Sequence, residues 1–335
     1  MANTEVLPIW RDTFCKLNYS QYGNCKKYRV INVENSETLF EGKIYWNNQD
    51  AFLKINDFAQ DCFYYNTDFP SDATTKMYSD VHLNVQLNEG VDSWVTVGDY
   101  YFYYDYSYDE EDRNKISKSI QMSDKFDPRA YFLWTVGGFS NSNYKCTITT
   151  TDKSGHTSPS TIVGNLDSYT KSEYNPSLRS ISVSVEFGGS QIEHYNFTAE
   201  NTCREYALYW INRYGGWQTY IITGKVTPKD SVIRNTYLHY VDNNLKRNFG
   251  NQSYMNEVTK QWQITTGFFT DEQSKLFTDL YSSPTVYLHN LDTNEIWSVN
   301  VNDKSVDVKL TSNQKKSNHF KHNLTVEASQ KQYRK

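Results

Sequence analysis

The chain has 335 residues, with 34 Lys and Arg against 39 Asp and Glu, which gives a formal net charge of -5. This length suits two or three domains better than one small module. Aromatic residues make up 16% of the chain, which argues against disorder, and the weak negative charge offers no general attraction for nucleic acid. No apolar run approaches the roughly 18 residues of a membrane-spanning helix.

Strand signals dominate the first hundred residues. Residues 28–33 and 39–46 alternate between apolar and polar side chains on either side of the turn-forming Asn35 and Ser36, so they predict a hairpin. Residues 81–87 alternate with a period of two. This period places four apolar side chains on one face of the strand: Val81, Leu83, Val85 and Leu87.

Similar patterns predict strands at 94–97, 131–136, 144–149 and 181–187. In the last of these, four apolar residues share one face: Ile181, Val183, Val185 and Phe187. We therefore expect a mainly β protein of two to three β-sandwich or barrel-like domains, with one short α-helix packed on the C-terminal sheet.

We expect three regions along the chain: an N-terminal β region at 1–75, an inserted β-sandwich at 76–195, and a C-terminal β region at 196–335. The two flanking regions are compatible with a single discontinuous domain that receives the sandwich as an insert.

A hairpin is predicted at 206–222. Gly215 and Gly216 provide its turn because glycine tolerates positive φ. The core side chains of its two strands are Tyr206, Leu208 and Trp210, then Tyr220 and Ile222.

The predicted helix lies near 271–281. Thr270 and Gln273 have the spacing of a capping box, and Ser283-Pro284 ends the helix. Its apolar stripe consists of Leu276, Phe277 and Leu280, and two further strands follow at 286–289 and 296–301.

The sequence assigns no catalytic, cofactor-binding or metal-binding residues, since it contains no nucleotide-binding, zinc-protease or hydrolase motif. His319 and His322 form an HxxH pair, but on a strand they point to opposite faces and do not share a metal. The five cysteines have no CxxC spacing. We interpret them as buried free thiols: Cys15, Cys25, Cys62, Cys146 and Cys203.

Three charged or aromatic runs are candidates for binding an ion, a sugar or another copy of the chain. The acidic run from Asp105 to Asp112 suits calcium, but it lacks the glycine and the ligand spacing of known calcium loops, so a solvated loop is favoured. The aromatic run Tyr100 to Tyr104 suits sugar stacking, yet alternation places at most three rings on one face, which favours a packed sheet. The basic segment from Lys304 to Lys335, which includes Lys315 and Lys316, suits head-to-tail contact with an acidic loop of another copy.

Three stretches together resemble a known group of proteins. They are LPIWRDTF at 7–14 with the following hairpin, CREYALYWINRYGGW at 203–217 running into YIITGK, and TDEQ at 270–273 through LYSSPTVYL to LTVEASQ at 324–330. This ordered set resembles tail-associated structural proteins of Bacteroidales phages and prophages, including tail-hub and ring components of crAss-like phages. The resemblance covers both flanks and spares residues 76–192.

The resemblance implies a virion tail component that forms a homo-oligomeric ring. It also implies contacts with neighbouring tail or portal-proximal proteins, and no catalysis or cofactor. Nucleic acid enters only as a genome passing through the ring lumen. Residues 1–5 show no secretory signal, so we expect synthesis in the host cytoplasm. The alternatives are a carbohydrate- or receptor-binding sandwich and a glycan-degrading enzyme, which needs two carboxylates about 5–10 Å apart.

Overall fold

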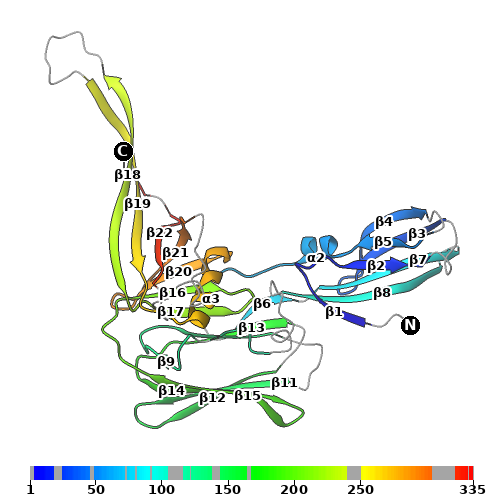
Figure 1. The fold of residues 1–335 in the computed structure, drawn as a ribbon, viewed down its shortest axis with the longest axis horizontal. Helices are drawn as coiled ribbons and strands as arrows, with labels where there is room; N and C mark the ends of the chain where they lie inside the picture. Colours follow the sequence, from blue (N-terminus) through cyan, green and yellow to red (C-terminus); the bar gives the residue numbers. More distant parts are fainter. Residues whose placement is uncertain are drawn as a thin grey trace, which may run out of the picture.

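The computed structural model describes residues 4–18, 25–45, 49–71, 74–79, 81–90, 93–104, 116–120, 122–137, 144–163, 167–239, 250–303, 321–330 and 332–334. Strands hold 62% of the residues and helices 8%, so the expected mainly β class is confirmed. Figure 1 shows three β-rich parts in chain order, with a long hairpin projecting from the C-terminal part.

The N-terminal part is a five-stranded sheet with β2, β5 and helix α2 packed on one face. The sheet order is β1 (Thr4–Pro8), β8 (Ser93–Tyr103), β7 (Val81–Gly90), β3 (Cys25–Asn32) and β4 (Glu37–Tyr45). The covering elements are β2 (Phe14–Leu17), β5 (Ala51–Lys54) and α2 (Asn56–Cys62). The predicted hairpin is confirmed as β3–β4, and the alternating face of β7 is buried beneath these elements.

The second part is a sandwich of two sheets. One has the order β10 (Phe132–Val136), β13 (Asp167–Glu173) and β6 (Thr74–Ser79). The other has the order β12 (Thr157–Val163), β11 (Tyr144–Asp152), β14 (Leu178–Phe187), β15 (Ser190–Ala199) and β9 (Lys125–Phe126). Ile181, Val183 and Val185 are buried between the sheets as expected, whereas Phe187 is partly exposed at the strand end.

The C-terminal part is one eight-stranded sheet. Its order is β17 (Trp217–Ile221), β16 (Tyr206–Ile211), β20 (Val286–Asn290), β21 (Glu295–Val301), β22 (Asn323–Ala328), β19 (Gly250–Thr265) and β18 (Lys225–His239), with β23 (Gln332–Arg334) on β19. Helix α3 (Asp271–Ser282) covers one face. The predicted hairpin is confirmed as β16–β17, and the predicted capping box is present.

The strand pairing sets a different boundary from the one expected at residue 76. β6 does join the sandwich, but β7 and β8 pair with β3 and β1 of the N-terminal sheet. The alternation of these strands indicates that one face is buried, but it does not indicate which sheet they join. The two flanks form separate sheets with separate cores.

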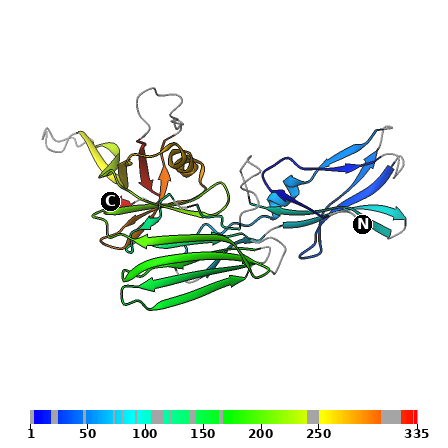
Figure 2. The same ribbon diagram turned by 60° about the horizontal axis from the view of Figure 1, so that its bottom comes forward.

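The sandwich and the C-terminal sheet stack as successive layers (Figure 2). β10 is buried on both faces: Phe132 and Trp134 belong to the sandwich core, while Leu133 belongs to a second buried cluster, together with Tyr209 and Trp217 of the C-terminal sheet. The layers therefore follow in this order: the five-stranded sheet of the sandwich, the three-stranded sheet of the sandwich, the C-terminal sheet, and helix α3.

A second helix, α2, was not expected from the sequence. It has seven residues, and no side chain caps its N-terminus. Asn56, its first residue, is buried and accepts a hydrogen bond from the backbone N–H of Thr13 at 3.2 Å. The helix therefore depends on a contact that is distant in sequence, which a local pattern cannot reveal.

Candidate functional site

The three parts meet at a shared cluster of aromatic side chains, which we call the junction cluster. Phe69, in the segment between α2 and β6, is half-buried and packs against this cluster, with ring centroids 5.1 Å from Tyr209, 5.2 Å from Tyr287 and 5.3 Å from Tyr131. Its buried members are Met77, Tyr78, Tyr104, Ala130, Leu133, Ala207, Tyr209, Ile211, Trp217 and Leu291. The segment between α2 and β6 connects the N-terminal part to the sandwich. Through this cluster, that segment is packed against the sandwich and the C-terminal sheet.

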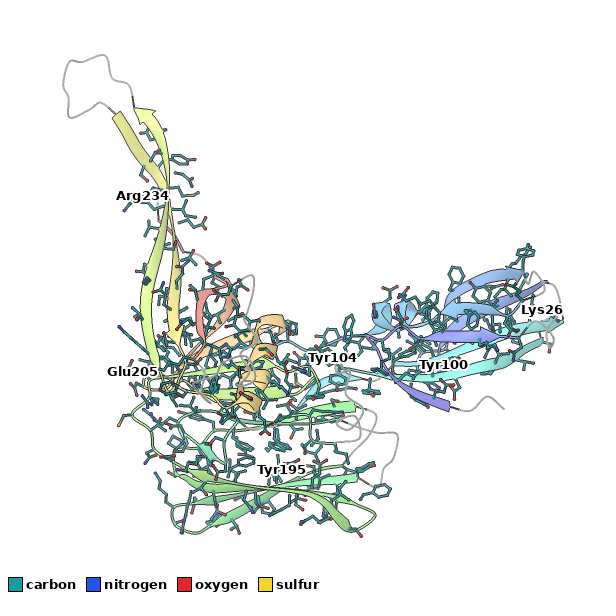
Figure 3. The ribbon with its side chains drawn as sticks, viewed as in Figure 1. Lys26, Tyr100, Tyr104, Tyr195, Glu205 and Arg234 are labelled. Atoms are coloured by element: carbon teal, nitrogen blue, oxygen red, sulfur yellow. The ribbon has the colours of Figure 1, made fainter. Side chains whose placement is uncertain are left out.

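The aromatic run at 100–104 contributes side chains both to the N-terminal core and to the junction cluster (Figure 3). Tyr100 and Phe102 are buried in the N-terminal core, and Tyr104 belongs to the junction cluster. Tyr103 is also buried, and Tyr101 stacks on His82 with ring centroids 3.8 Å apart. The expectation of a packed sheet is confirmed, since the run does not form an open platform for a sugar.

The two glycines of the β16–β17 turn lie against different parts of the chain: Gly215 contacts Tyr65, which lies between α2 and β6, and Gly216 lies beside Lys118. Gly215 has φ of 79°, which favours glycine, and its carbonyl accepts a hydrogen bond from the Tyr65 hydroxyl at 2.9 Å. Gly216 lacks positive φ. A Cβ there would lie 2.2 Å from the carbonyl oxygen of Lys118, so glycine is required for close approach of two backbones.

A cavity of about 260 Å³ lies between the sandwich and the C-terminal sheet. Aromatic side chains from both parts line it, including Phe126, Phe132, Tyr220 and Phe268. A cavity of this volume is smaller than the roughly 300–1,000 Å³ of a typical ligand pocket.

Asp127 lines this cavity, but its carboxylate is occupied by neighbouring groups. It accepts hydrogen bonds from the Arg129 guanidinium at 2.9 Å and from the Thr202 hydroxyl at 2.5 Å. Burial alone would raise the pKa of Asp127, but these hydrogen bonds outweigh it and hold the pKa below its usual value. The ionised Asp127 carboxylate therefore holds the Arg129 side chain in place. Arg129 also donates a hydrogen bond at 2.7 Å to Asp292, in the turn between β20 and β21 of the C-terminal sheet.

The most prominent surface feature is the β18–β19 hairpin, which we call the arm (Figure 1). Its strands have 15 and 16 residues, but β22 pairs only with Gln261 to Thr265 of β19, and β23 only with Asn256 to Val258. Six further residues of β19 therefore extend beyond any third strand, a length of about 20 Å.

The arm carries apolar side chains that its own sheet does not cover. The exposed fractions are 42% for Val232, 55% for Ile233, 45% for Tyr237 and 56% for Tyr254. Val232 and Ile233 are neighbours in β18, so they lie on opposite faces of the hairpin. Both faces of the arm therefore present apolar surface.

Of the remaining predicted residues, the structure describes the side chains of four of the five cysteines and that of His322. Cys15 and Cys146 are buried free thiols as expected, Cys62 is half-buried and free, and Cys203 is free but exposed, because it lies in the connection before β16. His322 is buried and its Nε2 lies 2.9 Å from the Ser274 hydroxyl.

Several predictions concern residues outside the described part of the chain. They are His319, the side chain of Cys25, the acidic run at 105–112, and Lys315 and Lys316 of the basic segment. The described residues contain no group of three His, Cys, Asp or Glu that could hold a metal ion.

Sequence reasoning missed the arm as a distinct feature. Its strands alternate weakly, and Pro228 interrupts the pattern. The signal that could have found it is length: two β-compatible stretches at 225–239 and 250–265 are longer than the usual strand of about 5–6 residues.

No protein-family model matches this chain, and a search of curated proteins finds no match either. In the described residues, no helix is long and apolar enough to cross a membrane.

Proposed function

We propose that the chain is a structural subunit of a bacteriophage tail, in a ring or hub that forms by self-association and by contacts with neighbouring tail or portal-proximal proteins. It is made in the host cytoplasm, acts in the virion, and needs neither catalysis nor a cofactor. The projecting arm is the observation that supports this proposal most strongly, together with the sequence resemblance of both flanks to such proteins.

The arm adds little to the stability of its own subunit. Beyond β23 the arm is a two-stranded ribbon, and such a ribbon is marginal by itself because it buries little apolar surface. The exposed side chains of the arm are Val232, Ile233, Tyr237 and Tyr254. Their apolar surface contributes favourable free energy when another surface covers it and removes it from water. A contact between subunits supplies such a surface, and Tyr is one of the residue types enriched there.

The packing of the sandwich against the C-terminal sheet also supports this function, because it holds the base of the arm in a fixed position relative to the rest of the subunit. β16 is buried on both faces, with Trp210 against helix α3 and Tyr209 against the sandwich. The Gly216 approach and the Arg129 bridge join the same two parts.

The experiment replaces residues 232–258 of the arm with Asn-Gly, which favours a tight hairpin turn after Ser231 and before Thr259. We expect the full chain to form a symmetric oligomer in light scattering and negative-stain microscopy. The shortened chain should keep the circular dichroism signature of its body but fail to form this oligomer. Mass spectrometry of phage particles should find the full chain in many copies.

Two results contradict the proposal. One is a full chain that stays monomeric and is absent from particles; the other is a shortened chain that assembles as well as the full one.

The alternative function is carbohydrate or receptor binding. The cavity favours it, because aromatic rings and polar side chains line the same space, with Phe268 65% exposed beside it. A chain that remains monomeric and is retained on a glycan column, with retention lost in Phe268→Ala and kept in Phe14→Ala, would support this alternative. Phe14 is a comparably exposed ring in the N-terminal part.

A further inference from the structure

Among the described residues, no strand pairs with the outer edge of β18. β18 is the last strand of its sheet in this part of the chain, and it pairs with β19 on one side only. Natural edges are commonly protected from pairing by proline and lysine. Here Lys225, Pro228 and Lys229 lie at the end of β18 nearest the body, while no proline follows from Asp230 to the end of the strand.

Pro228 also indicates which residues face outward along this edge. Proline has no N–H to donate, so in an edge strand it occupies a position whose N–H side faces solvent. It pairs with Trp262, and the register is regular up to Asn235. Because hydrogen-bonding direction alternates along a strand, Asp230, Val232 and Arg234 also turn their backbone groups outward.

These three residues form a sequence that is complementary to itself. In an antiparallel pair centred on Val232, Asp230 lies directly opposite Arg234 of the second strand, and Arg234 lies opposite Asp230. Val232 then lies opposite Val232. All three side chains share one face, and opposite charges directly across a strand pair are stabilising.

The side chains concerned are available for such a contact. Asp230, Val232 and Arg234 are exposed, and Figure 3 shows Arg234 on the arm beyond the body of the molecule. Neither Asp230 nor Arg234 forms an ion pair with another residue in the described part of the chain. Ser231 and Ile233 lie opposite each other on the second face, so no like charges oppose one another there.

We propose that two copies of this chain pair through the outer edge of β18, antiparallel and two-fold symmetric about Val232. The contact continues the sheet of one copy into that of the other. This inference rests on the proposed function, because it specifies one contact through which copies of the chain self-associate. Combined with a ring contact elsewhere on the surface, a two-fold contact stacks two rings face to face.

The test uses the full chain with Asp230→Arg, Arg234→Asp, and both changes together. Asp230→Arg places Arg opposite Arg twice, and Arg234→Asp places Asp opposite Asp twice, so each weakens pairing. The double variant restores opposite charges with the sign reversed. An equimolar mixture of the two single variants also restores them, because only pairs of unlike chains are then complementary.

Sedimentation equilibrium measures the concentration at which copies pair. We expect each single variant to raise this concentration about tenfold or more relative to wild type. The double variant and the mixture should both return near the wild-type value. Glu295→Arg, an equal change of charge on an exposed residue of β21, should leave it unchanged. Circular dichroism confirms that each variant is folded.

Wild-type assembly that is insensitive to both single variants overturns the pairing and leaves the proposed structural function standing. A mixture that stays as weak as its components also overturns the pairing. A wild-type chain that is monomeric at every concentration and absent from particles overturns both.

Discussion

At the scale of single residues, the junction contains a histidine whose surroundings favour the neutral form. His289 is fully buried, with Nδ1 3.1 Å from the Tyr209 hydroxyl and Nε2 2.9 Å from Oδ1 of Asn294. Tyr209 in turn accepts a hydrogen bond from the backbone N–H of Tyr131 at 3.0 Å. In a neutral ring with Nε2–H, both nitrogens are satisfied, so this chain of hydrogen bonds connects β20, β16 and the sandwich.

This arrangement predicts a pH dependence. Burial lowers the pKa of His289, although the hydrogen bond to Asn294 acts in the opposite direction. The unfolded chain therefore binds more protons in the window below the ordinary histidine pKa of about 6.5. The contribution of His289 to stability is complete above that value and decreases as the pH falls through it toward the folded pKa.

The measurement is urea unfolding of wild type and His289→Gln between about pH 7.5 and 5. We expect the variant to be less stable at pH 7.5, because its hydrogen bonds are poorer. The difference between the two should shrink as the pH falls. A difference that stays constant over this range would contradict the assignment.

At the scale of elements, α3 is specified by local residues whereas α2 is not. The Thr270 hydroxyl accepts a hydrogen bond from the Gln273 N–H at 3.3 Å, and the Gln273 side chain accepts one from the Thr270 N–H at 3.1 Å. Gln273 also donates to the carbonyl of Met122 at 2.8 Å, which links the start of the helix to the sandwich side of the molecule.

Removing this cap should have a small, defined cost. We expect Thr270→Ala to lower the free energy of unfolding by about 1 kcal/mol, because a backbone N–H loses its partner. Thr278→Ala is the matched control: this threonine is half-buried in the same helix, and its hydroxyl donates to the carbonyl of Lys275, three residues earlier in the helix. Chemical denaturation that shows equal losses for both variants would refute the role of the cap.

At the scale of the whole molecule, one sheet is packed on both sides. Leu280 of α3 is fully buried on one side of the C-terminal sheet, and Trp217 of β17 is fully buried on the other, in the junction cluster. The Trp217 backbone is also bonded into the sandwich, since its N–H donates to the Thr135 hydroxyl at 3.0 Å and its carbonyl accepts from Ser119 at 2.7 Å.

Truncating either side chain should therefore be costly. We expect losses of about 3–5 kcal/mol for Trp217→Ala and about 2–5 kcal/mol for Leu280→Ala, with reduced solubility in both. Tyr45→Ala, at a side chain 71% exposed, should change stability by no more than about 0.5 kcal/mol. Calorimetry that finds unchanged melting in both core variants would show that these side chains do not carry the packing.

The sequence alone determined features that depend on neighbours along the chain. The alternation of β7, the β3–β4 and β16–β17 hairpins and the capped helix α3 were all predicted, because strand period, turn residues and capping residues act over a few positions. For the same reason the sequence indicated that the aromatic run at 100–104 is packed. It did not indicate that Tyr100 and Tyr104 enter two different clusters.

Only the tertiary structure decided how these elements are grouped. Strand period does not encode the partner strand, so the membership of β7 and β8 in the N-terminal sheet could not be read from their pattern. Gly216 was expected to allow positive φ, but it is required by the backbone of Lys118, almost a hundred positions away in sequence. The exposure of the outer end of the arm depends on β22 and β23 pairing only with its inner part, because exposure is set by which surfaces remain uncovered after the sheets have formed.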